Sequence, residues 1–199
     1  QEMSRGLGDV YKRQHILQKD QLGTGHAVAT VVSDDLFVKN KSEFTVVVPG
    51  DVPAIDSKDI KLLISEVETK SSPVGFLTAI VDNPYGYGRV IRNNEETRIV
   101  EEKDCIDGER EINEINSGVY CFKTDFLIEN IDSLDTKNAQ GEFYLTDLIG
   151  IANNQKQDIV IVQVDEDSIK GINSMSQLNE VEDIMQKKLI EDFMAVSYT

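Results

Sequence analysis

Short apolar runs alternate with amphipathic helical patterns along this sequence, and that alternation constrains the fold more than any other feature. Residues 44–48 (FTVVV) form a β-branched run, typical of a strand buried on both faces of a sheet. Residues 57–69 instead carry apolar side chains at the spacing of one helix face. Those four side chains are Ile60, Leu63, Ile64 and Val67.

The same alternation continues to the end of the sequence. Strands are expected at residues 74–81, 89–92, 98–102, 115–122 and 159–164, and a last helix at residues 174–193. Ser174 and Gln177 form a capping-box signature at the start of that helix. Strands that alternate with helices predict an α/β domain with a mostly parallel, mixed sheet.

Charge and cysteine content exclude several classes of function. The 199 residues include 36 acidic and 20 basic side chains, a formal net charge of −16. Nucleic acids and membrane surfaces are polyanions, so neither is expected as a partner. No run approaches the roughly 18 apolar residues of a membrane-spanning helix. Cys105 and Cys121 are too few for a disulfide scaffold and fit no CxxC motif, which favours a reducing, cytoplasmic location.

The two ends of the chain differ from its interior. Residues 3–14 (MSRGLGDVYKRQ) have no amphipathic period, and residues 196–199 (VSYT) follow the last helix. We interpret residues 1–14 and 196–199 as non-native tails derived from sequencing adaptors, with a natural disordered tail as the alternative. Residues 15–195 would then be a partial domain.

Polar residues that follow predicted strands are the first site candidates, because ligands bind outside the carboxyl ends of strands in open α/β sheets. Asp51 follows Gly50 at the end of the first strand, where its carboxylate suits Mg²⁺; a turn aspartate is the alternative. Asn173 directly precedes the last helix, and an N-cap is its simpler interpretation. Asn116, in an Asn-Ser-Gly sequence, either contacts sugar hydroxyls or forms a turn.

Two further segments carry candidate residues. Gly23 and Thr24 precede a helical pattern, so exposed backbone amides there either bind an anion or a planar base or belong to a plain helix cap. Glu101 and Lys103 lie in a charged cluster at a strand end, for which a surface ion pair is the alternative. His26 has no second ligand at metal-binding spacing and is interpreted as structural. The sequence contains no GxSxG, HExxH, Walker A or GxGxxG motif, so neither a serine hydrolase nor a NAD enzyme is supported.

Seven short sequence motifs occur in the same order as in one known protein family. They are QLGTGHA (21–27), PGDVP (49–53), GYGRVI (86–91), RIVEEKD (98–104), INEINSGVY (112–120), NAQGEFYLTDLI (138–149) and GIN (171–173). Together they resemble the uridylyltransferase domain of bacterial bifunctional N-acetylglucosamine-1-phosphate uridylyltransferase/glucosamine-1-phosphate N-acetyltransferases. The resemblance covers nearly all of residues 15–193. It implies a Rossmann-like, glycosyltransferase-A-like nucleotidyltransferase fold. The strand with which the family's domain begins, and the Gly-rich loop after that strand, have no match in this sequence.

The resemblance also implies roles for individual residues. Gln18 matches a uracil-recognising glutamine, and Gly23 with Thr24 matches a pair that contacts the nucleotide. Asp51 and Asn173 match the two protein ligands of a catalytic Mg²⁺. The remaining assignments are substrate contacts at Gly50, Gly88, Glu101, Asn116, Tyr144 and Thr146, and a catalytic role for Lys103 beside Asp51 and Asn173.

The implied reaction joins UTP and N-acetylglucosamine-1-phosphate to give UDP-N-acetylglucosamine and pyrophosphate, with Mg²⁺ as cofactor. Intact members of the family also acetylate through a C-terminal β-helix that forms a trimer. That β-helix and the Gly-rich phosphate loop have no counterpart in this sequence, so negligible turnover is expected from the chain itself. Two alternatives remain open: a sister sugar-phosphate nucleotidyltransferase, and a non-catalytic sugar-nucleotide-binding module.

Overall fold

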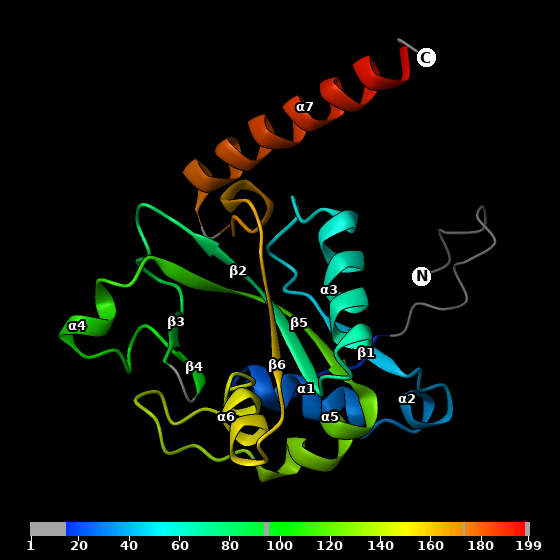
Figure 1. Cartoon of the computed structure of the whole chain (residues 1–199), viewed down its shortest axis with the longest axis vertical. Coiled ribbons are helices and arrows are strands. Elements are labelled where there is room, and N and C mark those ends of the chain that lie inside the picture. Colours follow the sequence, from blue (N-terminus) through cyan, green and yellow to red (C-terminus); the bar gives the residue numbers. More distant parts are fainter. Residues whose placement is uncertain (1–14, 94–95, 173, 198–199) are drawn as a thin grey trace.

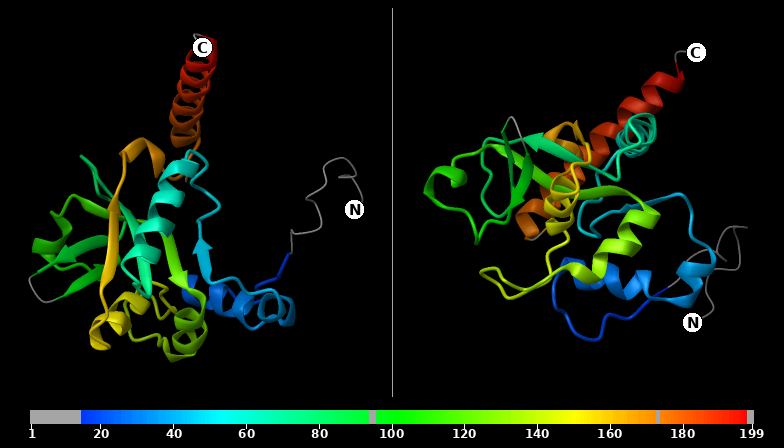
Figure 2. Two further views of the ribbon diagram at one scale, coloured as in Figure 1. Left: turned by 45° about the vertical axis from the view of Figure 1, so that its right-hand side comes forward. Right: turned by 60° about the horizontal axis from the view of Figure 1, so that its bottom comes forward.

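The computed structural model describes residues 15–93, 96–172 and 174–197. Its six strands form one sheet between helices, and the longest helix extends away from this body (Figures 1 and 2). The strands are β1 (Phe44–Val47), β2 (Val74–Ile80), β3 (Arg89–Arg92), β4 (Thr97–Val100), β5 (Glu114–Lys123) and β6 (Ile159–Gln163). The helices are α1 (Thr24–Val32), α2 (Asp35–Lys39), α3 (Ser57–Thr69), α4 (Asp107–Arg110), α5 (Thr124–Asn130), α6 (Asp147–Asn154) and α7 (Met175–Ser197), with 3₁₀ turns at Ile131–Ser133 and Glu166–Ser168.

Strand β5 is the central strand of the sheet. The strand order is β4-β3-β5-β2-β6, and β1 also pairs with β5. Only the β2–β6 pairing is parallel; β5 runs antiparallel to β1, β2 and β3, and β3 runs antiparallel to β4. The mixed α/β class is therefore confirmed, but the expectation of a mostly parallel sheet is wrong among the described strands. Apolar runs report the burial of a strand and carry no information on its direction.

Apolar side chains cover both faces of the sheet. On one face, α3 packs Leu63 and Val67 against Leu77 of β2 and Val160 of β6. On the other face, α1, α5 and α6 enclose a larger cluster around Phe76, which lies in the lower part of Figure 1. The predicted α3 has the observed bounds, Ser57–Thr69, because its apolar spacing is regular and Asp56 caps its first turn.

Two elements are less buried than their sequences suggest. Strand β1 is only half-buried and pairs with β5 alone among the described strands, so the expected burial on both faces is wrong. On α7, Val181 is buried, whereas Met175 and Leu189 are mostly exposed. The hydroxyl of Ser174 does accept the Gln177 backbone N–H at 3.2 Å, as the capping signature predicts. Within the described ranges, no helix is both long and apolar enough to cross a membrane.

Candidate functional site

A cavity of about 490 Å³ opens beside the carboxyl end of β1. It collects residues from α1, the β1–α3 turn, the loop before β3, the turn after β4, and β5. Six of the residues assigned from sequence line it: Thr24, Asp51, Gly88, Glu101, Asn116 and Thr146. The size suits a ligand no smaller than a sugar phosphate.

Glu101 and Thr146 form one polar wall of the cavity. The Thr146 hydroxyl donates a 3.2 Å hydrogen bond to Oε1 of Glu101. Burial raises the pKa of the Glu101 carboxyl, and the nearby carboxylates of Asp104 and Asp147 act in the same direction. A Cβ added at Gly88 would meet Oε2 of Glu101 at 3.3 Å, so glycine leaves this carboxylate room. A carboxyl and a hydroxyl together in such a wall can accept from and donate to the hydroxyls of a sugar.

Asn116 lies in the interior of β5, and its Oδ1 accepts the Gly118 backbone N–H at 3.2 Å, so the Asn-Ser-Gly sequence forms a local bend within the strand. Its backbone amide donates to the Gly88 carbonyl at 2.9 Å, and its side-chain amide donates to the Tyr120 hydroxyl at 2.6 Å. Gly118 adopts φ +76°, and the β2–β5 register shifts nearby, between Phe76 and Thr78. A bulge of this kind re-aims a strand's side chains toward a ligand site.

Asp51 lies on the exposed turn that follows β1, at the rim of the cavity. The Ile172 backbone N–H donates to the Asp51 carbonyl at 2.9 Å, and Gly171 lines the same cavity. The chain just before Asn173 is therefore held against Asp51. Asn173 itself lies outside the described residues, so its assignment as a metal ligand stays a prediction, while Gly50 lies in the turn but is not a lining residue.

Gln18 and Gly23 lie outside the cavity lining and make structural contacts. The Gln18 side-chain amide is 2.8 Å from Nδ1 of His26, which agrees with a structural histidine. A Cβ at Gly23 would lie 2.6 Å from the Phe143 carbonyl oxygen, and Gly23 has φ +110°. Glycine is therefore required there for close packing as well as for its backbone conformation. Thr24 reaches the cavity, and its hydroxyl accepts the Leu145 N–H at 3.1 Å.

Tyr144 and Lys103 are also outside the cavity lining. Tyr144 is buried, and this burial raises the pKa of its hydroxyl to about 12. Lys103 is exposed, and its Nζ donates to the Gln140 side chain at 2.5 Å. Their assigned roles at the substrate and in catalysis stay predictions.

The structure adds residues that the motifs did not single out. Tyr87 is the clearest case: it lines the cavity, and its hydroxyl accepts the Gly171 N–H at 3.5 Å. The turn-rich sequence NPYGYG marked its loop, but nothing in that pattern indicates that the ring reaches the segment before α7. Ser117, Gly118 and Tyr120 of β5 also line the cavity.

The described lining carries two carboxylates, Asp51 and Glu101, and neither lysine nor arginine. An anionic ligand in this cavity would therefore need a bound cation to neutralise its charge. No group of three or more His, Cys, Asp or Glu side chains in the described residues could hold a metal ion by itself. A single exposed carboxylate still fits Mg²⁺, which usually takes one or two protein carboxylates and completes its coordination with waters and substrate phosphates.

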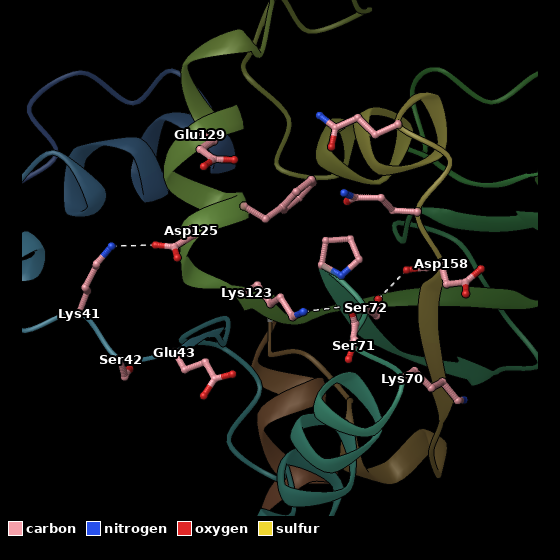
Figure 3. Close-up of a pocket in the computed structure, with 14 residues that line it drawn as sticks. Lys41, Ser42, Glu43, Lys70, Ser71, Ser72, Lys123, Asp125, Glu129 and Asp158 are labelled. Carbon is pink, nitrogen blue, oxygen red and sulfur yellow. Dashed lines mark hydrogen bonds and ion pairs between the residues drawn. The ribbon is translucent and has the colours of Figure 1, made fainter.

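A larger hollow, of about 710 Å³, lies at the other end of the sheet, near the amino ends of β2 and β6 (Figure 3). Lysines and carboxylates are mixed along its walls. Lys41 is paired with Asp125 at 2.7 Å, and Lys123 donates to the Ser71 carbonyl at 3.0 Å. It contains none of the residues assigned from sequence.

Curated relatives align with most of the chain. The bifunctional protein GlmU of Fervidobacterium nodosum is 43% identical over 183 residues, which are 92% of this chain and 39% of the relative. The GlmU of Clostridium tetani is 45% identical over 174 residues, 86% of this chain and 38% of the relative. The chain thus spans about two fifths of the length of these relatives.

Solved structures show the same fold at low sequence identity. A chain from Bacillus anthracis described as a glucose-1-phosphate thymidylyltransferase has a TM-score of 0.60 at 20% identity, covering 83% of this chain and 62% of that chain. A CMP:2-keto-3-deoxy-manno-octonic acid synthetase has a TM-score of 0.56 at 16% identity, covering 83% and 69%. These similarities confirm a Rossmann-like nucleotidyltransferase fold.

Residues 2–168 match the nucleotidyl transferase family. The chain therefore belongs to the nucleotidyl transferase family.

Proposed function

We propose that this domain serves the transfer of a uridylyl group from UTP to N-acetylglucosamine-1-phosphate, which gives UDP-N-acetylglucosamine and pyrophosphate. The main support is the cavity itself, because it brings Asp51, Glu101 and Asn116 together from three separate segments. The relatives that match most of the chain are GlmU proteins, which favours this acceptor over other sugar phosphates.

The residue types in the cavity suit phosphoryl chemistry. A sugar phosphate already carries a nucleophilic oxygen, so the protein has to position the two substrates and neutralise their charge. Mg²⁺, held in part by Asp51, would supply that positive charge when bound. Neither a serine, a cysteine nor a histidine nucleophile is required, and both cysteines, Cys105 and Cys121, are buried. Free thiols also support a reducing, cytoplasmic location.

The sugar would contact the wall formed by Gly88, Glu101 and Asn116. Carboxyl and amide groups are suitable partners for sugar hydroxyls and an N-acetyl group. The Asn116 and Glu101 side chains are already oriented by Tyr120 and Thr146, which lowers the entropy lost when a ligand binds. The nucleotide would then lie toward Thr24 on α1.

Binding of UDP-N-acetylglucosamine tests the proposal directly. Calorimetric titration of the 199-residue chain should show saturable binding that strengthens with Mg²⁺. Asp51→Asn should abolish the Mg²⁺ effect, and Asn116→Ala should weaken binding about tenfold or more, since a buried hydrogen-bond partner is lost. Asp183→Asn, at an exposed position of α7 outside the cavity lining, serves as the matched control.

The two alternative functions, a sister transferase and a non-catalytic binding module, predict different results in this titration. A sister transferase would prefer another sugar nucleotide in a panel that includes dTDP-glucose, CDP and ADP sugars. A pure binding module would bind UDP-N-acetylglucosamine without any response to Mg²⁺ or to Asp51→Asn. No binding by a folded chain would contradict the proposed site. Turnover by the chain alone is expected to be negligible, because its sequence contains no Gly-rich phosphate loop.

A further inference from the structure

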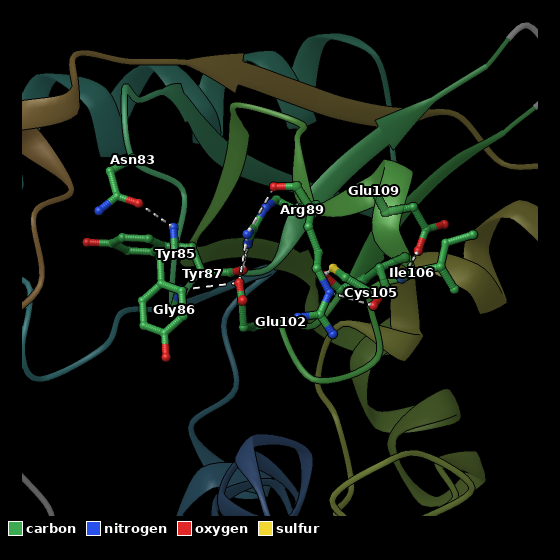
Figure 4. A network of polar contacts seen from close by, with 11 residues as sticks. Asn83, Tyr85, Gly86, Tyr87, Arg89, Glu102, Cys105, Ile106 and Glu109 are labelled. Carbon is green, nitrogen blue, oxygen red and sulfur yellow. Dashed lines mark hydrogen bonds and ion pairs between the residues drawn. The ribbon is translucent and has the colours of Figure 1, made fainter.

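A largely buried ion pair, formed by Arg89 and Glu102, lies in one polar network with Gly86 and Tyr87 (Figure 4). Nη2 of Arg89 is 2.7 Å from Oε2 of Glu102, and the two side chains are only 2% and 21% exposed. Removing two charges from water costs several kcal/mol, which the attraction between them offsets only with good geometry and further hydrogen bonds. Nε of Arg89 even lacks a hydrogen-bond partner within the described part of the chain. Stability alone is therefore a weak explanation for this pair.

Both members of the pair hold the same loop. Oε2 of Glu102 also accepts the backbone N–H of Gly86 at 3.3 Å. The Arg89 guanidinium donates to the backbone carbonyl of Tyr87. Two consecutive residues of the loop are thus held by charge-assisted hydrogen bonds, which are about twice as strong as neutral ones. Gly86 and Tyr87 both line the cavity.

The pair also ties together two separate parts of the cavity wall. Arg89 directly follows Gly88, and Glu102 directly follows Glu101; Gly88 and Glu101 line the cavity, whereas Arg89 and Glu102 do not. The Arg89 guanidinium also donates to the Arg110 backbone carbonyl at 3.5 Å. A shift of either charged side chain would therefore be transmitted to the residue beside it in the wall.

We infer that Arg89 and Glu102 are positioning residues, which fix the Gly86–Tyr87 backbone so that the loop before β3 presents a preformed surface to the sugar half of the ligand. The inference rests on the proposed function for the identity of that ligand. Thr24, at the expected nucleotide end, instead accepts the Leu145 N–H from the segment before α6. Loss of the pair should accordingly weaken binding of the sugar and leave binding of the nucleotide unchanged.

The test compares Glu102→Ala with Glu114→Ala in the full chain. Glu114 of β5 pairs with Arg92 at the end of β3, whereas Glu102 accepts the Gly86 N–H of the loop. Glu114→Ala therefore also removes one glutamate–arginine pair and serves as the control. The first measurement is backbone amide exchange of Gly86. The second is the pair of dissociation constants for UDP-N-acetylglucosamine and for UMP, both with Mg²⁺. Glu102→Gln, which keeps one acceptor oxygen, is the rescue variant.

The expected result is an increase of about tenfold or more in Gly86 exchange in Glu102→Ala, because local opening becomes easier. Affinity for UDP-N-acetylglucosamine should fall about tenfold, as expected for a lost hydrogen bond to a charged group, with UMP affinity unchanged. Glu102→Gln should recover part of both effects, and Glu114→Ala should show neither.

Equal exchange in Glu102→Ala and Glu114→Ala would overturn the inference, and so would an equal loss of affinity for both ligands. If Glu102→Ala does not fold, Glu102→Gln and Arg89→Lys are judged by the same two measurements. If the wild-type chain binds neither ligand, the proposed function fails, and the exchange measurement still decides whether the pair holds the loop.

Discussion

The hydroxyl of Thr146, just before α6, donates a 3.2 Å hydrogen bond to the carboxylate of Glu101, which follows β4. This bond favours the ionised carboxylate, but burial outweighs it and raises the pKa of Glu101 above its ordinary value of 4.5. The folded protein therefore keeps a proton on Glu101 at pH values where the unfolded chain has released it.

Replacement of this carboxyl should change stability in a pH-dependent way. As pH rises from 4.5 through the raised pKa of Glu101, the wild-type chain loses stability that Glu101→Gln retains. The variant should thus be the more stable protein at pH 7. It should equal wild type below about pH 4, where Glu101 is protonated in both the folded and the unfolded state. Urea denaturation across this range measures the difference. A constant difference at all pH values would contradict the assignment to Glu101.

The two cysteines should be unreactive in the native protein. Cys121 is fully buried, and burial raises the pKa of its thiol to about 11; the pKa of Cys105 is raised for the same reason. Because the thiolate is the reactive form, a disulfide reagent such as DTNB should label neither thiol at pH 7.5 and both after unfolding in guanidinium. Rapid labelling of one thiol in the folded chain would show that the core around it opens.

Adjacent leucines of α3 provide a matched test of the core. Leu63 is fully buried and Leu62 is 49% exposed. Leu63→Ala should lower the free energy of unfolding by about 2–5 kcal/mol, because it removes buried apolar surface and leaves a cavity. Leu62→Ala should change it by about 0.5 kcal/mol or less. Denaturant unfolding of both variants compares the two; similar losses would contradict the burial of this helix face.

Two glycine-to-alanine substitutions should change the free energy of unfolding in opposite directions. Gly118 has φ +76°, and a Cβ there would lie 2.8 Å from Cγ of Pro49, so Gly118→Ala should cost about 1–3 kcal/mol. It should also weaken ligand binding, because Pro49 belongs to the turn that carries Asp51. Gly150 lies inside α6 with no atom within 4 Å of an added Cβ, so Gly150→Ala should stabilise by about 0.5–1 kcal/mol. Thermal unfolding, together with the titration described above, distinguishes them.

The local sequence pattern was sufficient to predict the strongly periodic helices and strands. The bounds of α3 and β3 agree with those expected from the sequence. Strands β2 and β6 differ from expectation by one residue at one end, and β5 by one residue at each end. The short helices α2, α4 and α5 were not predicted, because they span only four to seven residues and their apolar side chains show no sustained period. Sheet direction was also missed, since pairing partners lie far apart in the sequence.

The sequence by itself determined the α/β class, the order of its main elements, and a set of motifs whose residues suit a nucleotidyltransferase. Only the tertiary structure decided which of those residues meet. Thr24, Asp51, Glu101 and Asn116 share one cavity, whereas Gln18 bonds to His26 and Lys103 to Gln140. The physical reason is that motif and periodicity describe neighbours along the chain, but a cavity, a buried ion pair such as Arg89–Glu102 and a raised pKa arise from contacts between distant segments.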